Sequence, residues 1–145
     1  MDRSASEPFL NMRFRVEIDG MRETGVLEVV FPAARLGRQA KNGIRVRYGT
    51  MFLKRGVGRS QEWYAWWDQA RKVRKAAMRA VTVTLLDEAG SSAHRWTFHN
   101  TRPVAYSISN LNALGHEALT ETLELSVGGF DASDASALIA ATAMD

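Results

Sequence analysis

The chain has 145 residues, of which 46% are hydrophobic and 24% are charged, and its formal net charge is +3. This length suits a single domain with a buried core, and the absence of cysteine excludes disulfides and thiolate metal sites. No apolar run approaches the ~18 residues of a membrane-spanning helix, and the first residues show no signal-peptide pattern, so we expect synthesis and assembly in the cytoplasm.

The first half of the chain is predicted to form β-strands. The stretch Phe9–Asp19 alternates, with Phe14, Val16 and Ile18 on one face, which is typical of a half-buried strand. Asp19-Gly20 indicates a hairpin turn. Three more strands are expected, over Thr24–Phe31, Ile44–Tyr48 and Met51–Arg55. A long polar loop over Ala33–Gly43 is expected between the first and the second of these strands.

A helix is predicted over Ser60–Ala77. Ser60 is a suitable N-cap, because its hydroxyl can accept a free backbone N–H of the first turn. Trp63, Trp66 and Trp67 fall on one apolar stripe, which favours packing against a sheet over a stacking platform for bases. Their spacing predicts that Trp63 and Trp67 are mostly buried and that Trp66 lies at the edge of the contact.

The second half returns to strands, and the last of them carries an unusual charge. Strands are expected over Val81–Leu86, Arg95–Phe98, Val104–Ile108 and about Glu117–Val127. In the last strand Glu121 interrupts a face formed by four apolar residues, namely Leu119, Leu123, Leu125 and Val127. Because an unpaired buried carboxylate is costly, we expect Glu121 either to lie beyond the core or to pair with an arginine of this chain or of a neighbouring subunit.

The sequence contains no pattern that predicts catalysis, a cofactor or a metal. Of the three histidines, His94 and His99 are five apart, so a strand would point them to opposite faces, and neither belongs to a zinc motif. No serine lies in a nucleophile motif, and Gly56-Val57-Gly58 lacks the third glycine of a dinucleotide fingerprint. We therefore expect a protein that is not an enzyme, with no catalytic, cofactor-binding or metal-ligating residues.

Several short segments, in order, resemble the phage tail-tube protein family, whose members form the inner tube of contractile phage tails and phage-like contractile injection systems. They span about Phe9 to Phe130, and they are Phe14–Gly20, Leu53–Val57, Glu62–Trp67, Leu85–Gly90, Arg95–Phe98, Arg102–Val104, Leu111–Ala113 and Glu121–Leu125. The segment between Val30 and Tyr48 is shorter and more basic than is usual in the family. A single domain over residues 1–130 is therefore expected, followed by an Ala-rich extension over 131–145 that is poorly ordered or loosely helical.

The resemblance implies a mainly β fold with one α-helix, namely an antiparallel β-sandwich or barrel flanked by that helix. It also implies a structural subunit that forms stacked rings, expected to be hexamers, around a central channel, either as the main tube subunit or as the one that starts the tube at the baseplate. The partners implied are other copies of the chain, sheath and baseplate proteins, and a tape-measure protein or cargo in the channel, with nucleic acid only in passage. No cofactor is implied, and the destination is a phage tail or an injection particle.

Two further expectations concern surfaces. Arg35, Arg38 and Lys41 lie on the long loop, and such loops usually carry a function or a contact, so we expect these residues, and Glu121, at an interface between subunits or rings. The alternative function is a small basic nucleic-acid-binding module, because phosphate recognition uses clustered Arg and Lys. It requires one continuous basic face, and Glu117, Glu121 and Glu124 argue against such a face.

Overall fold

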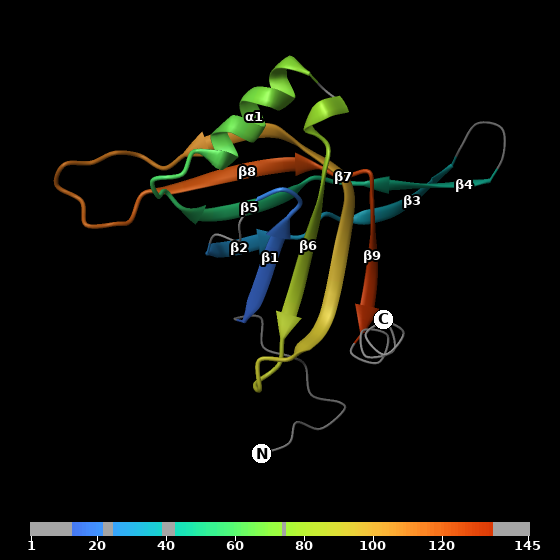
Figure 1. The fold of residues 1–145 in the computed structure, drawn as a ribbon. Helices are drawn as coiled ribbons and strands as arrows, with labels where there is room; N and C mark the ends of the chain where they lie inside the picture. The colour runs from blue at the N-terminus through green and yellow to red at the C-terminus, as the bar shows by residue number, and fades with distance from the viewer. Residues whose placement is uncertain (1–12, 22–24, 39–42, 74, 135–145) are drawn as a thin grey trace.

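The computed structural model describes residues 13–21, 25–38, 43–73 and 75–134, and within them the fold is mainly β (Figure 1). One α-helix, α1 (Glu62–Lys72), and a short 3₁₀-helix, η1 (Lys75–Ala77), connect β5 to β6. The strands are β1 (Phe14–Ile18), β2 (Val26–Val30), β3 (Ala34–Arg38), β4 (Ile44–Tyr48), β5 (Met51–Gly56), β6 (Arg79–Leu86), β7 (Ser92–Ile108), β8 (Thr120–Ser126) and β9 (Gly129–Asp134).

Two antiparallel layers share the long strand β7. Its first part pairs with β6 and β9, and its last part pairs with β8, so β7 forms the corner between the layers. The strand order is β1-β6-β7-β8-β5-β2, with β9 beside β7. The strands β1 and β2 end this path without pairing with each other in the described part of the chain. The single chain is therefore an open sandwich and not a closed barrel.

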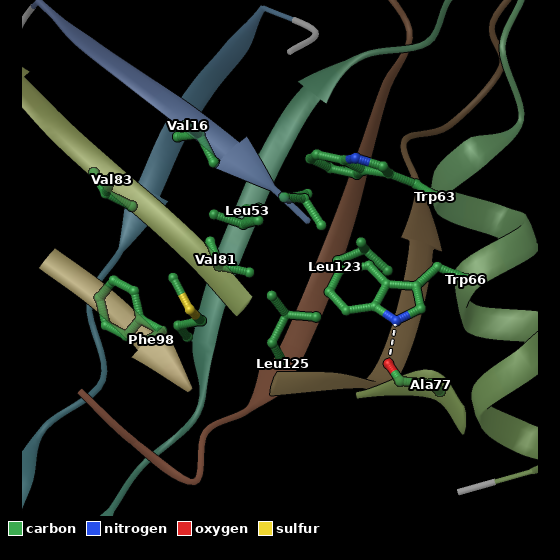
Figure 2. Close-up of a cluster of buried hydrophobic side chains, with 12 residues drawn as sticks. Val16, Leu53, Trp63, Trp66, Ala77, Val81, Val83, Phe98, Leu123 and Leu125 are labelled. Atoms are coloured by element: carbon green, nitrogen blue, oxygen red, sulfur yellow. Dashed lines mark hydrogen bonds between the residues drawn. The ribbon is translucent and has the colours of Figure 1, made fainter. Parts of the chain in front are cut away.

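The core lies between the two layers and is built from alternate strand residues. In one cross-strand row Ile18 lies opposite Val81, which lies opposite Phe98. From the other layer, Leu53 and Leu123 pack against these residues and are fully buried (Figure 2). Because β-branched and aromatic residues fit a pleated, half-buried surface, the alternation in the sequence indicates these strands and this face correctly.

The helix α1 covers the open end of the core with two tryptophans. Trp63 and Trp66 are each 1% exposed, and the indole Nε1 of Trp66 donates a hydrogen bond to the backbone oxygen of Ala77 (Figure 2). Trp67 is only half-buried. The prediction that Trp67 is more buried than Trp66 is therefore wrong, because the helix packs against the sheets through its i, i+3 row and not through its i, i+4 row.

The ends of the helix also differ from the prediction. Ser60 accepts the N–H of Glu62 through its hydroxyl at 3.2 Å, although the N-cap position itself is Gln61. The helix stops at Lys72 and not at Ala77, because Val73 is extended, with φ −137° and ψ 102°. This break lets η1 turn back and place Ala77 under the indole of Trp66.

Two segments expected to lack regular structure form strands. The predicted loop over Ala33–Gly43 contains β3, which pairs with β4. The first four residues of the expected tail, 131–134, belong to β9 and pair with β7, so the expectation of poor order or loose helix is wrong for them. Residues 135–145 lie outside the described part of the chain.

Candidate assembly surfaces

The strands β3 and β4 form a two-stranded ribbon, called the arm below, that projects from the body of the molecule (Figure 1). In the register of the arm, Leu36 lies opposite Val46 and Arg38 lies opposite Ile44. Since cross-strand partners share a face, these residues form a mainly apolar side. Leu36 is 73% exposed and Ile44 is 71% exposed.

The second face of the arm is basic. Arg35 lies directly opposite Arg47, and Arg45 lies opposite Gly37 on the same face. All three arginines are exposed. Like charges placed directly opposite each other on a ribbon destabilise it, and an isolated two-stranded ribbon is at best marginally stable in water. The arm therefore exposes one mainly apolar face and one basic face to solvent.

The base of the arm is fixed to the body. The ring of Tyr48 meets that of Phe130 edge-on, with ring centroids 5.5 Å apart. The N–H of Gly49 donates to the oxygen of Ala33 at 2.8 Å, which joins the two strands of the arm where they leave the body. The base of the arm thus contacts β9, the strand that the sequence pattern did not indicate.

A buried charged cluster lies at the end of β5 that is farthest from the arm. Glu121 is 3% exposed, and it accepts a hydrogen bond from Nε of Arg55 at 2.8 Å and one from the hydroxyl of Tyr106 at 2.7 Å. The guanidinium of Arg55 lies over the ring of Trp63, 4.2 Å from its centroid. Burial and the hydrogen bond to Glu121 raise the pKa of Tyr106 to about 12. Of the possibilities left open by the sequence, the structure shows pairing with an arginine of the same chain.

The segment between β7 and β8 presents two leucines to solvent, a feature that the sequence analysis did not single out. Leu111 is 84% exposed and Leu114 is 89% exposed. The side chain of Asn112 accepts the N–H of Leu114, and its backbone oxygen accepts the N–H of Gly115, so a tight turn holds the leucines outward. Leucines inside a polar turn sequence are the signal that would have indicated this site.

The predicted interface residues are not brought together. Arg35 and Arg38 lie on opposite faces of the arm, because they are three positions apart on one strand. Glu121 lies in the body on β8. Lys41 falls outside the described residues.

The described residues contain no group of three or more His, Asp and Glu side chains arranged to hold a metal ion. In the same part of the chain, no helix is long and apolar enough to cross a membrane.

Comparison with known proteins links this geometry to a family. The chain is similar to a solved structure of the anti-feeding prophage baseplate, with 20% identity, TM-score 0.63 and coverage of 89% of this chain and 97% of that one. It is also similar to the sheath/tube terminator structure of the extracellular contractile injection system PVC, with 15% identity, TM-score 0.69 and coverage of 90% and 99%. A third similar structure is Hcp1 from Flavobacterium johnsoniae, with 16% identity, TM-score 0.62 and coverage of 83% and 94%.

At these identities the likeness of the structures shows a shared fold. None of the curated proteins matches the sequence of this chain. The model of the family described as "T4-like virus tail tube protein gp19" matches residues 10–131, which span all the described strands except the end of β9. The chain therefore belongs to the gp19 tail tube protein family of T4-like viruses.

Proposed function

We propose that this chain forms six-membered rings, and that these rings stack into the inner tube of a contractile phage tail or a phage-like injection system. Membership of a tail tube family makes the chain a structural tube protein and not an enzyme. The observation that carries the proposal for rings is the arm, which has one apolar and one basic face and no partner for either within the described chain.

The charges of the arm indicate the chemistry of its partner. Arg35 and Arg47 are directly opposite each other, so carboxylates on a neighbouring subunit would relieve their repulsion. We propose that Arg35, Arg38 and Lys41 all contact a neighbour in the same ring or in the next one. Because both carboxylate oxygens of Glu121 are bonded inside the chain, we propose an indirect role for Glu121, which is to hold β5 and β8 in register.

The open edges of the sandwich suit a ring. Strand β2 forms the edge beside β5, and it exposes Leu27 and Val30. Strand β1 forms the opposite edge, beside β6. Exposed edges promote uncontrolled pairing with other chains, and a head-to-tail ring that closes by rotation would cover them in every subunit.

The further partners in this proposal are sheath and baseplate proteins of the same particle, and a tape-measure protein or cargo inside the channel. We propose that the chain assembles in the cytoplasm and then becomes part of the particle. Solved structures of similar fold come from a baseplate, a tube cap and a sheath–tube complex. Both the main tube subunit and the tube initiator are therefore compatible with this fold.

Electron microscopy and native mass measurement of the purified chain test the proposal. Six-membered rings or tubes with a central channel are expected at high protein concentration. The double variant Leu36→Ser/Val46→Ser, which alters only the apolar face of the arm, should remain folded and lose rings or stacking. A chain that stays monomeric over all salt and protein concentrations would refute the proposal. Monomers that bind oligonucleotides tightly would instead favour a nucleic-acid-binding module.

A further inference from the structure

The outward face of the layer formed by β1, β6, β7 and β9 carries a row of polar residues that run across the four strands. Arg15 on β1 lies opposite Thr84 on β6, Thr84 lies opposite Arg95 on β7, and Arg95 lies opposite Ser133 on β9. Cross-strand partners share a face and lie about 5 Å apart. Two guanidinium groups thus flank one threonine hydroxyl on the same surface.

Unsatisfied hydrogen-bonding groups concentrate in this row. Among the described residues, four buried side-chain polar atoms have no hydrogen-bond partner, and three of them are Nε of Arg15, Oγ1 of Thr84 and Nε of Arg95. Thr84 is 0% exposed. Buried polar groups in native proteins are almost always hydrogen-bonded, because leaving one unpaired is costly. Three such unpaired atoms in one row indicate that a ligand from outside the chain forms hydrogen bonds with them.

The chemistry of the row points to an anion. Guanidinium groups only donate hydrogen bonds, and their planar fork suits a carboxylate or a phosphate. Within the described part of the chain, the acidic neighbour of Nε of Arg15 is Oε1 of Glu17 at 3.4 Å, which is a loose contact. Arg15 also lines a polar hollow of about 610 Å³ beside β1, together with Glu17 and Thr82 of the next row, so solvent reaches this end of the arginine row.

The next row along the same face limits the size of the ligand. Glu17 lies opposite Thr82, Thr82 opposite Thr97, and Thr97 opposite Asp131, so this row is acidic. It follows the arginine row at a distance of two strand residues, about 7 Å. A continuous phosphate backbone that crossed both rows would meet both Glu17 and Asp131, whereas a single anion between the arginines would meet only Glu17, the loose neighbour of Arg15.

We propose that Arg15, Thr84 and Arg95 form a binding site for one oxyanion, supplied either by a free phosphate-like ion or by an acidic side chain of a bound polypeptide. The anion accepts hydrogen bonds from both guanidiniums, and the Thr84 hydroxyl donates from the floor between them. All three residues belong to one chain, so the site does not depend on the formation of rings.

The test measures anion binding to the full chain by calorimetry and by the shift in melting temperature. Sodium phosphate is compared with sodium chloride at equal ionic strength, because specific binding to the native state raises its stability. Phosphate should bind and stabilise the wild type more than chloride does. In Arg15→Gln and Arg95→Gln the affinity should fall by about tenfold or more, since each removes a charge-assisted donor.

Arg59→Gln is the matched control, because it removes the same charge from an exposed residue outside the row, and it should bind phosphate like the wild type. Circular dichroism verifies the fold of every variant. Arg95→Lys keeps the charge and loses the planar fork of the guanidinium. It should give an intermediate affinity, and it replaces Arg95→Gln if that variant does not fold.

Equal phosphate binding by the wild type and a folded Arg15→Gln or Arg95→Gln would overturn the site. Thr84→Val should weaken binding, and unchanged binding would remove Thr84 from it.

Two additional ligands distinguish the sources of the anion. A peptide with one glutamate in a neutral sequence should compete with phosphate if an acidic side chain supplies the anion, and failure to compete would leave the free ion as the source. Single-stranded DNA should bind no more tightly than phosphate. Tight, arginine-dependent binding of DNA would overturn the single-anion proposal. The oligomeric state is measured on the same samples, so a failure to form rings and a failure to bind the anion are recorded separately.

Discussion

In the body of this molecule, the apolar residues of the core are buried against one another within the chain, whereas the arm exposes the same kinds of residue to solvent. Leu53 and Leu123 are cross-strand partners on β5 and β8, and both are fully buried. Leu36 and Val46 are cross-strand partners on the arm, and both are exposed. Since apolar burial is the main favourable term in folding and association, the core of the body stabilises the single chain, whereas the exposed apolar face of the arm supports our proposal that it contacts another subunit.

The charged residues show the same contrast. In the body, Arg55 meets Glu121 across the β5–β8 pair, and both are buried. On the arm, Arg35 meets Arg47. The first pair is neutralised inside the chain, and for the second we propose acidic groups on a neighbouring subunit. Substitutions in the body should therefore change the free energy of unfolding, and substitutions in the arm should change assembly.

The largest effect on stability is expected from Trp66→Ala. It removes a fully buried indole and the hydrogen bond to Ala77, and it leaves a cavity between α1 and the sheets. The free energy of unfolding should fall by about 3–5 kcal/mol, as measured by urea denaturation. Trp67→Ala is the control on the same helix and should cost clearly less, because Trp67 is only half-buried. Equal losses for the two variants would contradict the orientation of α1.

Breaking the buried ion pair should have the next largest effect. Glu121→Gln removes the buried carboxylate that pairs with the guanidinium of Arg55, so the free energy of unfolding should fall by about 3 kcal/mol. The double variant Arg55→Met/Glu121→Leu removes both charges and should recover most of that loss, because a buried pair costs much to desolvate. If the double variant is as unstable as Glu121→Gln, the ion pair contributes more to the stability of the fold than the neutralisation of its two charges.

The sequence predicts the body better than the arm, for a physical reason. Strands β1, β6 and β8 bury one face, so Val16, Val83 and Leu125 mark them by alternation. Strand β3 buries neither face in the isolated chain, and its two arginines and one glycine are as typical of a polar loop as of a strand. A strand that buries neither face in its own chain leaves little hydrophobic periodicity in its sequence.

Two other features, the partner of Glu121 and the burial of the tryptophans, cannot be predicted without knowing which residues are neighbours in the folded chain. The partner of Glu121 is Arg55, which lies 66 positions earlier in the sequence, and only the β5–β8 register brings them together. For the tryptophans, both the i, i+3 and the i, i+4 rows of a helix are compatible with an apolar stripe. The choice between them depends on how α1 crosses the sheets and where η1 places Ala77.

A smaller, pH-dependent effect is expected at Tyr106. Its pKa in the folded chain is raised to about 12, chiefly by burial and then by the hydrogen bond to Glu121. Because the folded pKa lies above the ordinary value of about 10, the contribution of Tyr106 to stability is fully present below pH 10 and is lost as the pH rises through 12. Ultraviolet titration should show a tyrosine ionising near pH 12, and Tyr106→Phe should lack that step. A step that persists in Tyr106→Phe would belong to another residue.

The smallest effect on the stability of the isolated chain, and the largest on assembly, is expected from Arg47→Glu. In the arm this change replaces the Arg35–Arg47 repulsion with an attractive cross-strand pair, and such pairs contribute only about 0.2–1 kcal/mol. The monomer should therefore be unchanged or slightly more stable in urea denaturation. Ring formation or stacking should nevertheless weaken, because the substituted face would repel the acidic groups that we propose on the neighbouring subunit. Sedimentation and electron microscopy at matched protein concentration measure that loss, and Arg59→Gln, outside the arm, should assemble like the wild type. Normal rings and tubes from Arg47→Glu would show that the basic face of the arm contacts no acidic partner, and the apolar face would then have to carry the contact alone.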